Sequence, residues 1–256
     1  ELTVTDSKKK QWQLPLPVVQ LNALSHSEVI ILPLKAYQIA EFIEKNQRLI
    51  HNKQILVLLH NGMGTIEIVQ QLLPNNSLIA ATTNYGAFKP DEHSLQIKGL
   101  GGSDFGWVKL QPDCQQEAIE QVLSQLLPPA SWHQDIRLAL WHKLAINAAI
   151  NPLTAIHNVN NGALRAPKFQ ALMHRVNKVI DDTAGNFSSM NRDVHAKRLT
   201  EIDFINGYIA KQAKEHDVLC PINLSLLNKV KALERSYTQK MNNLYSKSLE
   251  LHGDGK

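Results

Sequence analysis

Hydrophobic and polar positions divide the chain into two parts with different patterns. From about residue 25 to residue 130, short runs that are apolar throughout alternate with segments whose apolar residues recur at helical spacing. Runs that are apolar on both faces are typical of parallel strands covered by helices on both sides. After Pro128-Pro129 the pattern is helical, with no strand pattern in between. We therefore expect an α/β domain over 1–130 and an all-α domain over 131–256.

Strand and helix patterns alternate through the first part. The run EVIILPL precedes the helical pattern AYQIAEFIEKN, and QILVLLH precedes TIEIVQQLL, which is followed by the run SLIAATT. SLQIKGLGG and FGWVKL then read as two strands around a glycine-rich turn, so we expect a hairpin there. Another helical pattern runs from Cys114 to Leu127. The helical patterns of the second part are ALWHKLAINAAI, KFQALMHRVNKVIDDTAGNF, RLTEIDFINGYIAKQAKEHD and LSLLNKVKALERSY.

The glycine-rich stretch GLGGSDFG, residues 99–106, invites comparison with a dinucleotide-binding loop. The third glycine of G-x-G-x-x-G would fall at Asp104, and the following WVKLQP does not open a helix. The 256 residues therefore contain no glycine-rich phosphate loop.

One helix of the second part carries a polar stripe on an apolar background. In LWHKLAINAAINPL, residues 140–153, Lys143, Asn147 and Asn151 fall within about 80 degrees of one another around a helix. Burying an unpaired ammonium group is costly, so such a lysine extends to solvent, is paired, or is functional. Composition alone favours a structural or solvent-reaching lysine.

Four further polar sites have both a functional and a structural interpretation. HNGMG, residues 60–64, follows the run ILVLL, where open α/β sheets place their binding residues, but an Asn-Gly turn explains it equally well. Lys35 and Gln38 follow VIILPL in the same way, and the start of a surface helix also accounts for them. NFSSM, with Ser189, is compatible with a helix end, and Glu201 with a capping carboxylate.

Composition and charge limit the classes of partner. The formal charge of +4 comes from scattered basic residues, which gives little support for a nucleic-acid surface and suits a small anionic ligand equally well. Cys114 and Cys220 lack metal-ligand spacing and suit the reducing cytoplasm. No apolar run approaches the roughly 18 residues of a membrane span. We expect no metal, membrane or nucleic-acid partner.

Six segments, in the same order along the chain, resemble the ketopantoate reductase (2-dehydropantoate 2-reductase) family. The run K-x-x-x-N-x-x-x-N-P-L-T-A with later S-S-M and T-E-I-D motifs is highly specific, and the resemblance extends from about Ser27 to Tyr237. The matching segments are LKAYQ (34–38), HNGMGTIE (60–67), LWHKLAINAAINPLTAI (140–156), NNGAL (160–164), NFSSM (186–190) and RLTEIDFINGYI (198–209).

This resemblance implies an enzyme of pantothenate and coenzyme A biosynthesis that reduces 2-dehydropantoate to pantoate with NADPH. The first domain would be a Rossmann-like NADP-binding domain, and the helical domain would bind substrate. Lys143 resembles the family's catalytic proton donor, and Glu201 a partner of that lysine and of the cofactor. The implied substrate-binding residues are Asn61, Asn147, Asn151, Asn161 and Ser189, and the implied cofactor-binding residues are Lys35, Gln38, Asn61, Ala87 and Glu201.

The chain departs from the family pattern at its start. Family members open with a strand, a glycine-rich turn, a helix and a second strand that reads the 2′-phosphate, so we expect about 30 residues of this βαβ unit ahead of Glu1. Without this unit, the sequence does not indicate whether NADPH is preferred over NADH. A truncated, non-catalytic relative that binds a small acid or a partner chain is one alternative, and a reductase of another branched 2-keto acid is a second. A monomer and a homodimer are both compatible with the sequence.

Overall fold

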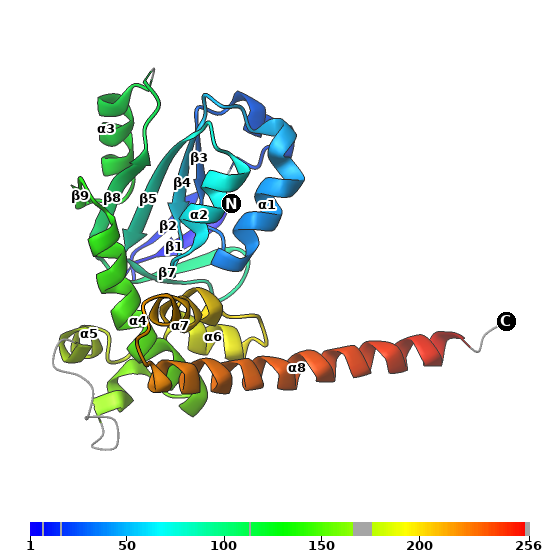
Figure 1. The fold of residues 1–256 in the computed structure, drawn as a ribbon. Coiled ribbons are helices and arrows are strands. Elements are labelled where there is room, and N and C mark those ends of the chain that lie inside the picture. The colour runs from blue at the N-terminus through cyan, green and yellow to red at the C-terminus, as the bar shows by residue number, and fades with distance from the viewer. Residues whose placement is uncertain (7, 16, 113, 166–175, 254–256) are drawn as a thin grey trace. The chain divides into compact units, whose positions relative to one another are not determined.

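The computed structural model describes residues 1–6, 8–15, 17–112, 114–165 and 176–253. They form two compact units (Figure 1). The first comprises Glu1–His60 and Gly64–Trp141, and the second comprises Asn61–Met63 and His142–Lys256. The division between the units lies at Trp141/His142, inside helix α4, whereas the hydrophobic pattern places it at 130/131.

The first unit contains a five-stranded sheet of order β3-β4-β5-β8-β9. Strands β3, β4 and β5 pair in parallel, β5 and β8 are antiparallel, and β8 and β9 are parallel. The predicted parallel strands EVIILPL, QILVLLH and SLIAATT are thus confirmed. The bounds are β3 (Val29–Leu32), β4 (Ile55–Leu59), β5 (Ser77–Thr83), β8 (Ser103–Lys109) and β9 (Ala130–Trp132).

Helices cover both faces of this sheet (Figure 1). Leu56 and Leu58 of β4 pack toward α1 and α2, whereas Ile55 and Val57 pack toward α3. Because successive strand residues point to opposite faces, a strand covered on both sides must be apolar at every position. Each such buried side chain contributes roughly 1.5–3 kcal/mol. The helices are α1 (Ile39–Asn46), α2 (Thr65–Leu72) and α3 (Gln116–Leu126), with 3-10 turns η1 (Leu21–His26), η2 (Ala36–Gln38) and η3 (Gln47–Leu49).

A second sheet of the same unit has the order β2-β1-β7-β6. It shows that the hairpin predicted around the glycine-rich stretch is wrong, since β7 pairs with β1 and β6, whereas β8 pairs with β5 and β9. The bounds are β1 (Leu2–Thr5), β2 (Gln11–Leu14), β6 (Gly86–Phe88) and β7 (Ser94–Gly99).

Close backbone packing explains why the stretch between β7 and β8 is rich in glycine. A Cβ atom on Gly101 would lie 2.4 Å from the carbonyl carbon of Asn84, so no larger residue fits there. The Asn84 amide donates to the carbonyl oxygen of Gly102 at 2.9 Å. Gly101 therefore allows the chain to pass from one sheet to the other against Asn84, and the stretch does not form a hairpin turn.

The second unit is helical throughout its described residues, apart from turns and loops. Its small core includes Ile150, Leu164 and Ile180. Part of the expected helix 168–187 lies outside the described residues. The bounds are α4 (Arg137–His157), which starts in the first unit, η4 (Asn161–Arg165), α5 (Val176–Asp182), α6 (Ser189–His195), η6 (Ile202–Phe204), α7 (Asn206–Glu215) and α8 (Pro221–Gly253).

The pattern of RLTEIDFING predicts the start of a continuous helix, and this prediction is wrong. Only a single 3-10 turn, η6, precedes α7, which begins at Asn206. Thr200 and Glu201 lie in an irregular turn, where Glu234 accepts hydrogen bonds from the amide and the hydroxyl of Thr200. No helix within the described part of the chain combines the length and apolarity needed to cross a bilayer.

Candidate active site

Helix α4 carries the polar stripe predicted from the sequence. Lys143 and Asn147 are half-buried and Asn151 is only 6% exposed, while Leu144 and Ile150 beside them are fully buried. A spacing of four residues places the three polar side chains on one side of the helix. The stripe is therefore part of the packed helical unit and not a solvated surface.

The stripe crosses a proline, and another residue compensates for it. Pro152 lies inside α4 and has no N–H, so the carbonyl group of Ala148, four residues earlier, loses its helical donor. The side-chain amide of Asn206 donates to this oxygen at 3.2 Å and to Oδ1 of Asn223 at 2.9 Å. Asn206 is fully buried. It therefore ties α4, between Asn147 and Asn151, to α7 and α8.

A hydrogen-bonded network joins the end of the stripe to the start of α6. The Thr154 hydroxyl donates to the carbonyl oxygen of Asn151 at 2.9 Å and lies 2.6 Å from the Ser188 hydroxyl, which must then donate to it. Ser188 also accepts from the Asn191 amide at 3.1 Å and caps α6. The interpretation of NFSSM as a helix end is thus confirmed. Ser189 is the first residue of α6, next to this network.

Asn161 lies in a turn that packs against the residues just before α6. Its amide donates to the carbonyl oxygen of Asn186 at 2.8 Å, and its side chain donates to the Thr183 hydroxyl at 2.9 Å. A Cβ atom on the neighbouring Gly162 would lie 2.8 Å from the carbonyl oxygen of Ala184. Among the described atoms, the buried Oδ1 of Asn161 has no hydrogen-bond partner. This oxygen is an acceptor that a ligand could use.

Asn61 and Glu201 are brought together by the HNGM turn. Gly62 has a φ of +88°, and a Cβ atom there would lie 2.7 Å from the carbonyl oxygen of Phe204, to which Met63 donates at 2.9 Å. Asn61 Nδ2 lies 3.4 Å from Oε2 of Glu201, which is 3% exposed. The capping interpretation of Glu201 is wrong, since its side chain makes no cap hydrogen bond to η6.

The predicted cofactor residues lie in the first unit, apart from Asn61 and Glu201. Lys35 lies three residues after the end of β3 and is half-buried, and its amide donates to the side-chain oxygen of Gln38 at 3.0 Å. Gln38 thus caps η2. Ala87, expected in a loop, is an exposed residue of strand β6 in the second sheet. Lys35 and His60 follow parallel neighbours, β3 and β4, and so lie at the same edge of the main sheet.

Sequence reasoning missed Asn206, although it lies in the matching segment RLTEIDFINGYI. A proline inside an apolar helix leaves a carbonyl group without its donor, so Pro152 signals that some side chain must replace that donor. A single asparagine within the apolar run of FINGYI is a natural candidate, but sequence alone does not pair the two.

Comparisons with known proteins identify the family of the chain. Residues 1–109 match the family model "Ketopantoate reductase PanE/ApbA", and residues 135–178 and 173–234 match its C-terminal model. The chain is 35% identical over 244 residues to the 2-dehydropantoate 2-reductase of Vibrio cholerae serotype O1, covering 86% of this chain and 82% of the relative. It is 35% identical over 236 residues to the enzyme of the same name from Salmonella typhi, covering 84% and 77%.

Two solved structures share the fold. A PanE/ApbA family ketopantoate reductase from Ralstonia eutropha JMP134 has a TM-score of 0.80 at 18% identity, covering 93% of this chain and 86% of that one. D-mandelate dehydrogenase with NADH and anilino(oxo)acetate has a TM-score of 0.75 at 24% identity, with the same coverage. With both family models matched and relatives above 30% identity over most of its length, the chain belongs to the ketopantoate reductase family.

Proposed function

We propose that this protein reduces the ketone of 2-dehydropantoate to the alcohol of pantoate, with NADPH as the hydride donor. The observation that supports this most is the stripe of Lys143, Asn147 and Asn151 on α4, a cation and two amides beside the buried Leu144 and Ile150. Relatives at 35% identity carry the name 2-dehydropantoate 2-reductase.

Lys143 would act as the proton donor. When a hydride adds to the ketone carbon, the carbonyl oxygen gains negative charge, and an ammonium group beside it stabilises that charge before transferring its proton. The product is the neutral alcohol, and the lysine regains a proton from solvent. Glu201 would favour the charged form of the ammonium group, since a nearby carboxylate stabilises a cation. Asn61, 3.4 Å from Glu201, would orient that carboxylate.

The amides and the serine would hold the substrate. Its carboxylate, ketone and hydroxyl need both donors and acceptors, which asparagine supplies on one side chain. Asn147, Asn151 and Ser189 would contribute donors, and the unpartnered Oδ1 of Asn161 would accept from the hydroxyl. Thr154, which bonds to the carbonyl oxygen of Asn151, would keep its helix turn in place.

The residues present fit one end of NADPH. Lys35 and the HNGMG turn follow parallel strands at the edge where open α/β sheets bind nucleotides, and Gln38 and Ala87 would line the same cofactor. The pyrophosphate site is different, because the 256 residues contain no G-x-G-x-x-G turn between a strand and a helix. When bound, the cofactor supplies the hydride.

The test is NADPH oxidation by the protein from its natural gene. We expect oxidation with ketopantoate and much slower oxidation with another branched 2-keto acid. Lys143→Ala should lower kcat by about 10²–10⁴-fold, as expected for loss of general acid catalysis, without unfolding the protein. Lys229→Ala, at an exposed lysine of α8, is the matched control and should keep full activity.

Two outcomes would contradict the proposal at different points. If the protein consumes no NADPH with ketopantoate, the activity is wrong. If Lys143→Ala keeps full kcat, the activity stands but the proton donor is another group. We also propose that the enzyme works in the cytoplasm, where its free thiols Cys114 and Cys220 stay reduced.

A further inference from the structure

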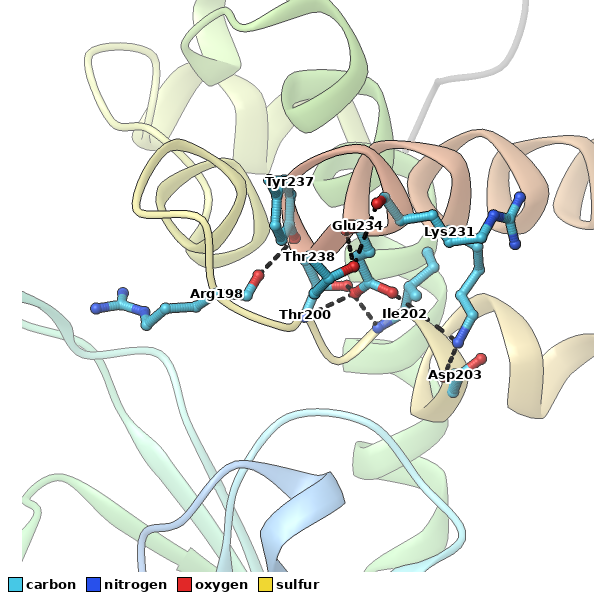
Figure 2. Close-up of polar contacts among 9 residues, drawn as sticks. Arg198, Thr200, Ile202, Asp203, Lys231, Glu234, Tyr237 and Thr238 are labelled. Carbon is cyan, nitrogen blue, oxygen red and sulfur yellow. Dashed lines mark hydrogen bonds and ion pairs between the residues drawn. The ribbon is translucent and has the colours of Figure 1, made fainter. Parts of the chain in front are cut away.

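A buried carboxylate on helix α8 faces the turn that carries Glu201 (Figure 2). Glu234 is only 5% exposed, and a carboxylate in such a place is costly unless hydrogen bonds satisfy it. We infer that Glu234 is a positioning residue that sets the place of the Glu201 side chain, a role that rests on the function proposed above for Glu201.

Glu234 holds the residue before Glu201 by two bonds from one oxygen. Its Oε1 accepts from the backbone amide of Thr200 at 2.8 Å and from the Thr200 hydroxyl at 2.7 Å. Thr200 is itself 4% exposed, so water does not replace these bonds easily. Hydrogen bonds to a charged acceptor are about twice as strong as those between neutral groups. The two bonds therefore fix both the backbone and the side chain of Thr200.

The same contact extends to the residue after Glu201. Because the Thr200 hydroxyl donates its proton to Glu234, its oxygen is available to accept, and the amide of Ile202 donates to it at 3.2 Å. The carbonyl oxygen of Glu201 accepts from Phe204 at 3.0 Å. Glu201 thus lies between two held residues, with its own backbone bonded as well. The position of its side chain therefore depends on this turn, together with Asn61 Nδ2, which lies 3.4 Å from Oε2 of Glu201.

Neighbouring side chains on the same face of α8 hold the rest of the loop. Lys231 Nζ lies 2.6 Å from Oδ2 of Asp203 and 3.9 Å from Oε2 of Glu234, and the Tyr237 hydroxyl donates to the carbonyl oxygen of Arg198 at 2.6 Å. Lys231 and Tyr237 are each three residues from Glu234, a spacing that makes side chains neighbours on a helix surface. Figure 2 shows these side chains reaching from α8 to both ends of the turn. Along α8, Glu234 lies between Lys231 and Tyr237, the two residues that make these contacts.

Hydrogen exchange tests whether Glu234 holds the turn. In Glu234→Ala the amides of Thr200 and Ile202 should exchange about ten-fold faster or more than in the wild type, as expected for loss of a charge-assisted bond. Glu234→Gln keeps the shape and the acceptor, so it should raise exchange only two- to three-fold, by rough estimate. Arg235→Ala, at the exposed neighbour on α8, should change neither amide. Unchanged exchange in both Glu234 variants would overturn the inference.

Kinetics tests whether Glu234 acts through Glu201. We expect Glu234→Ala to lower kcat about ten-fold with little change in KM, Glu234→Gln to retain most activity, and Glu234→Ala to have no further effect in a Glu201→Gln background. If the two single effects multiply in the double variant, Glu234 does not act through Glu201. If the wild type lacks the reductase activity, the proposed function fails, and the exchange experiment still decides whether Glu234 holds the turn.

Discussion

At the scale of single residues, the proline in α4 and the asparagine that compensates for it form a pair. Pro152 removes one helical donor, and Asn206 supplies a replacement to Ala148 at 3.2 Å. A buried carbonyl group left without a donor costs about 1–3 kcal/mol. The helix therefore keeps its polar stripe across the proline only because a side chain from α7 completes its bonding.

We predict that Asn206→Ala lowers the free energy of unfolding by about 1–3 kcal/mol, because two buried hydrogen bonds are lost. In Pro152→Ala, the amide of the new residue can donate to the carbonyl oxygen of Ala148. The loss of unfolding free energy caused by Asn206→Ala should therefore be about 1 kcal/mol smaller in that background. Urea denaturation of the wild type, the two single variants and the double variant measures these free energies. Asn228→Ala, at an exposed asparagine, is the control. Strictly additive effects would mean that the two residues do not share the carbonyl group.

Gly62 is a second residue whose identity the local geometry dictates. Its φ is +88°, and a Cβ atom there would lie only 2.7 Å from the carbonyl oxygen of Phe204, so there is no room for a side chain. We predict that Gly62→Ala destabilises the protein by roughly 1–3 kcal/mol and lowers kcat/KM, because the turn holds Asn61 near Glu201. Thermal unfolding and steady-state kinetics measure the two effects. A variant as stable and as active as the wild type would show that the turn moves freely.

At the scale of elements, the start of α4 depends on pH. The Arg137 amide donates to the Asp135 carboxylate at 3.0 Å and, with the Arg137 guanidinium, lowers the pKa of that carboxyl group below its usual value. A lowered pKa in the folded state means that the ionised form stabilises the fold. This contribution is present above the unfolded pKa of about 4 and is lost as the pH falls through the folded value.

We therefore predict that Asp135→Ala lowers the Tm more at pH 6 than at an acid pH below the lowered folded pKa of Asp135, where the wild-type carboxyl group is also uncharged. The measurement is thermal unfolding at several pH values between these limits, with Glu92→Ala, at another exposed acid of the same unit, as the control. An equal loss of Tm at both pH values would rule out the ionised carboxylate as the cause.

Strands buried on both faces could be predicted from the sequence. Elements whose place depends on the strands they pair with could not. Strand β4 is apolar throughout because helices cover both its sides, and that pattern is visible in the sequence. Strand β2, QWQL, is exposed at every position and only four residues long, so its alternation is too short to identify a strand from the sequence. The glycines at 99–102 indicate a change of direction, but sequence does not show that β7 and β8 leave for different sheets.

At the scale of the whole molecule, the residues of the candidate site were predictable from the order of their motifs, but their supports were not. The spacing of Lys143, Asn147 and Asn151 on a helix is a local property and follows from sequence. The bond between Thr200 and Glu234 joins residues 34 apart, and neither motif by itself indicates the other. Which segments meet is decided by packing of the whole helical unit.

The path of the chain has a consequence for building hybrids between relatives. Asn61–Met63 belong to the helical unit, although β4 before them and α2 after them belong to the first unit. A hybrid joined once, at Trp141/His142, would therefore combine the HNGM turn of one parent with the Phe204 turn of the other, although the Met63 amide donates to the carbonyl oxygen of Phe204 at 2.9 Å. Modular exchange within this family should succeed more often when residues 61–63 travel together with 142–256.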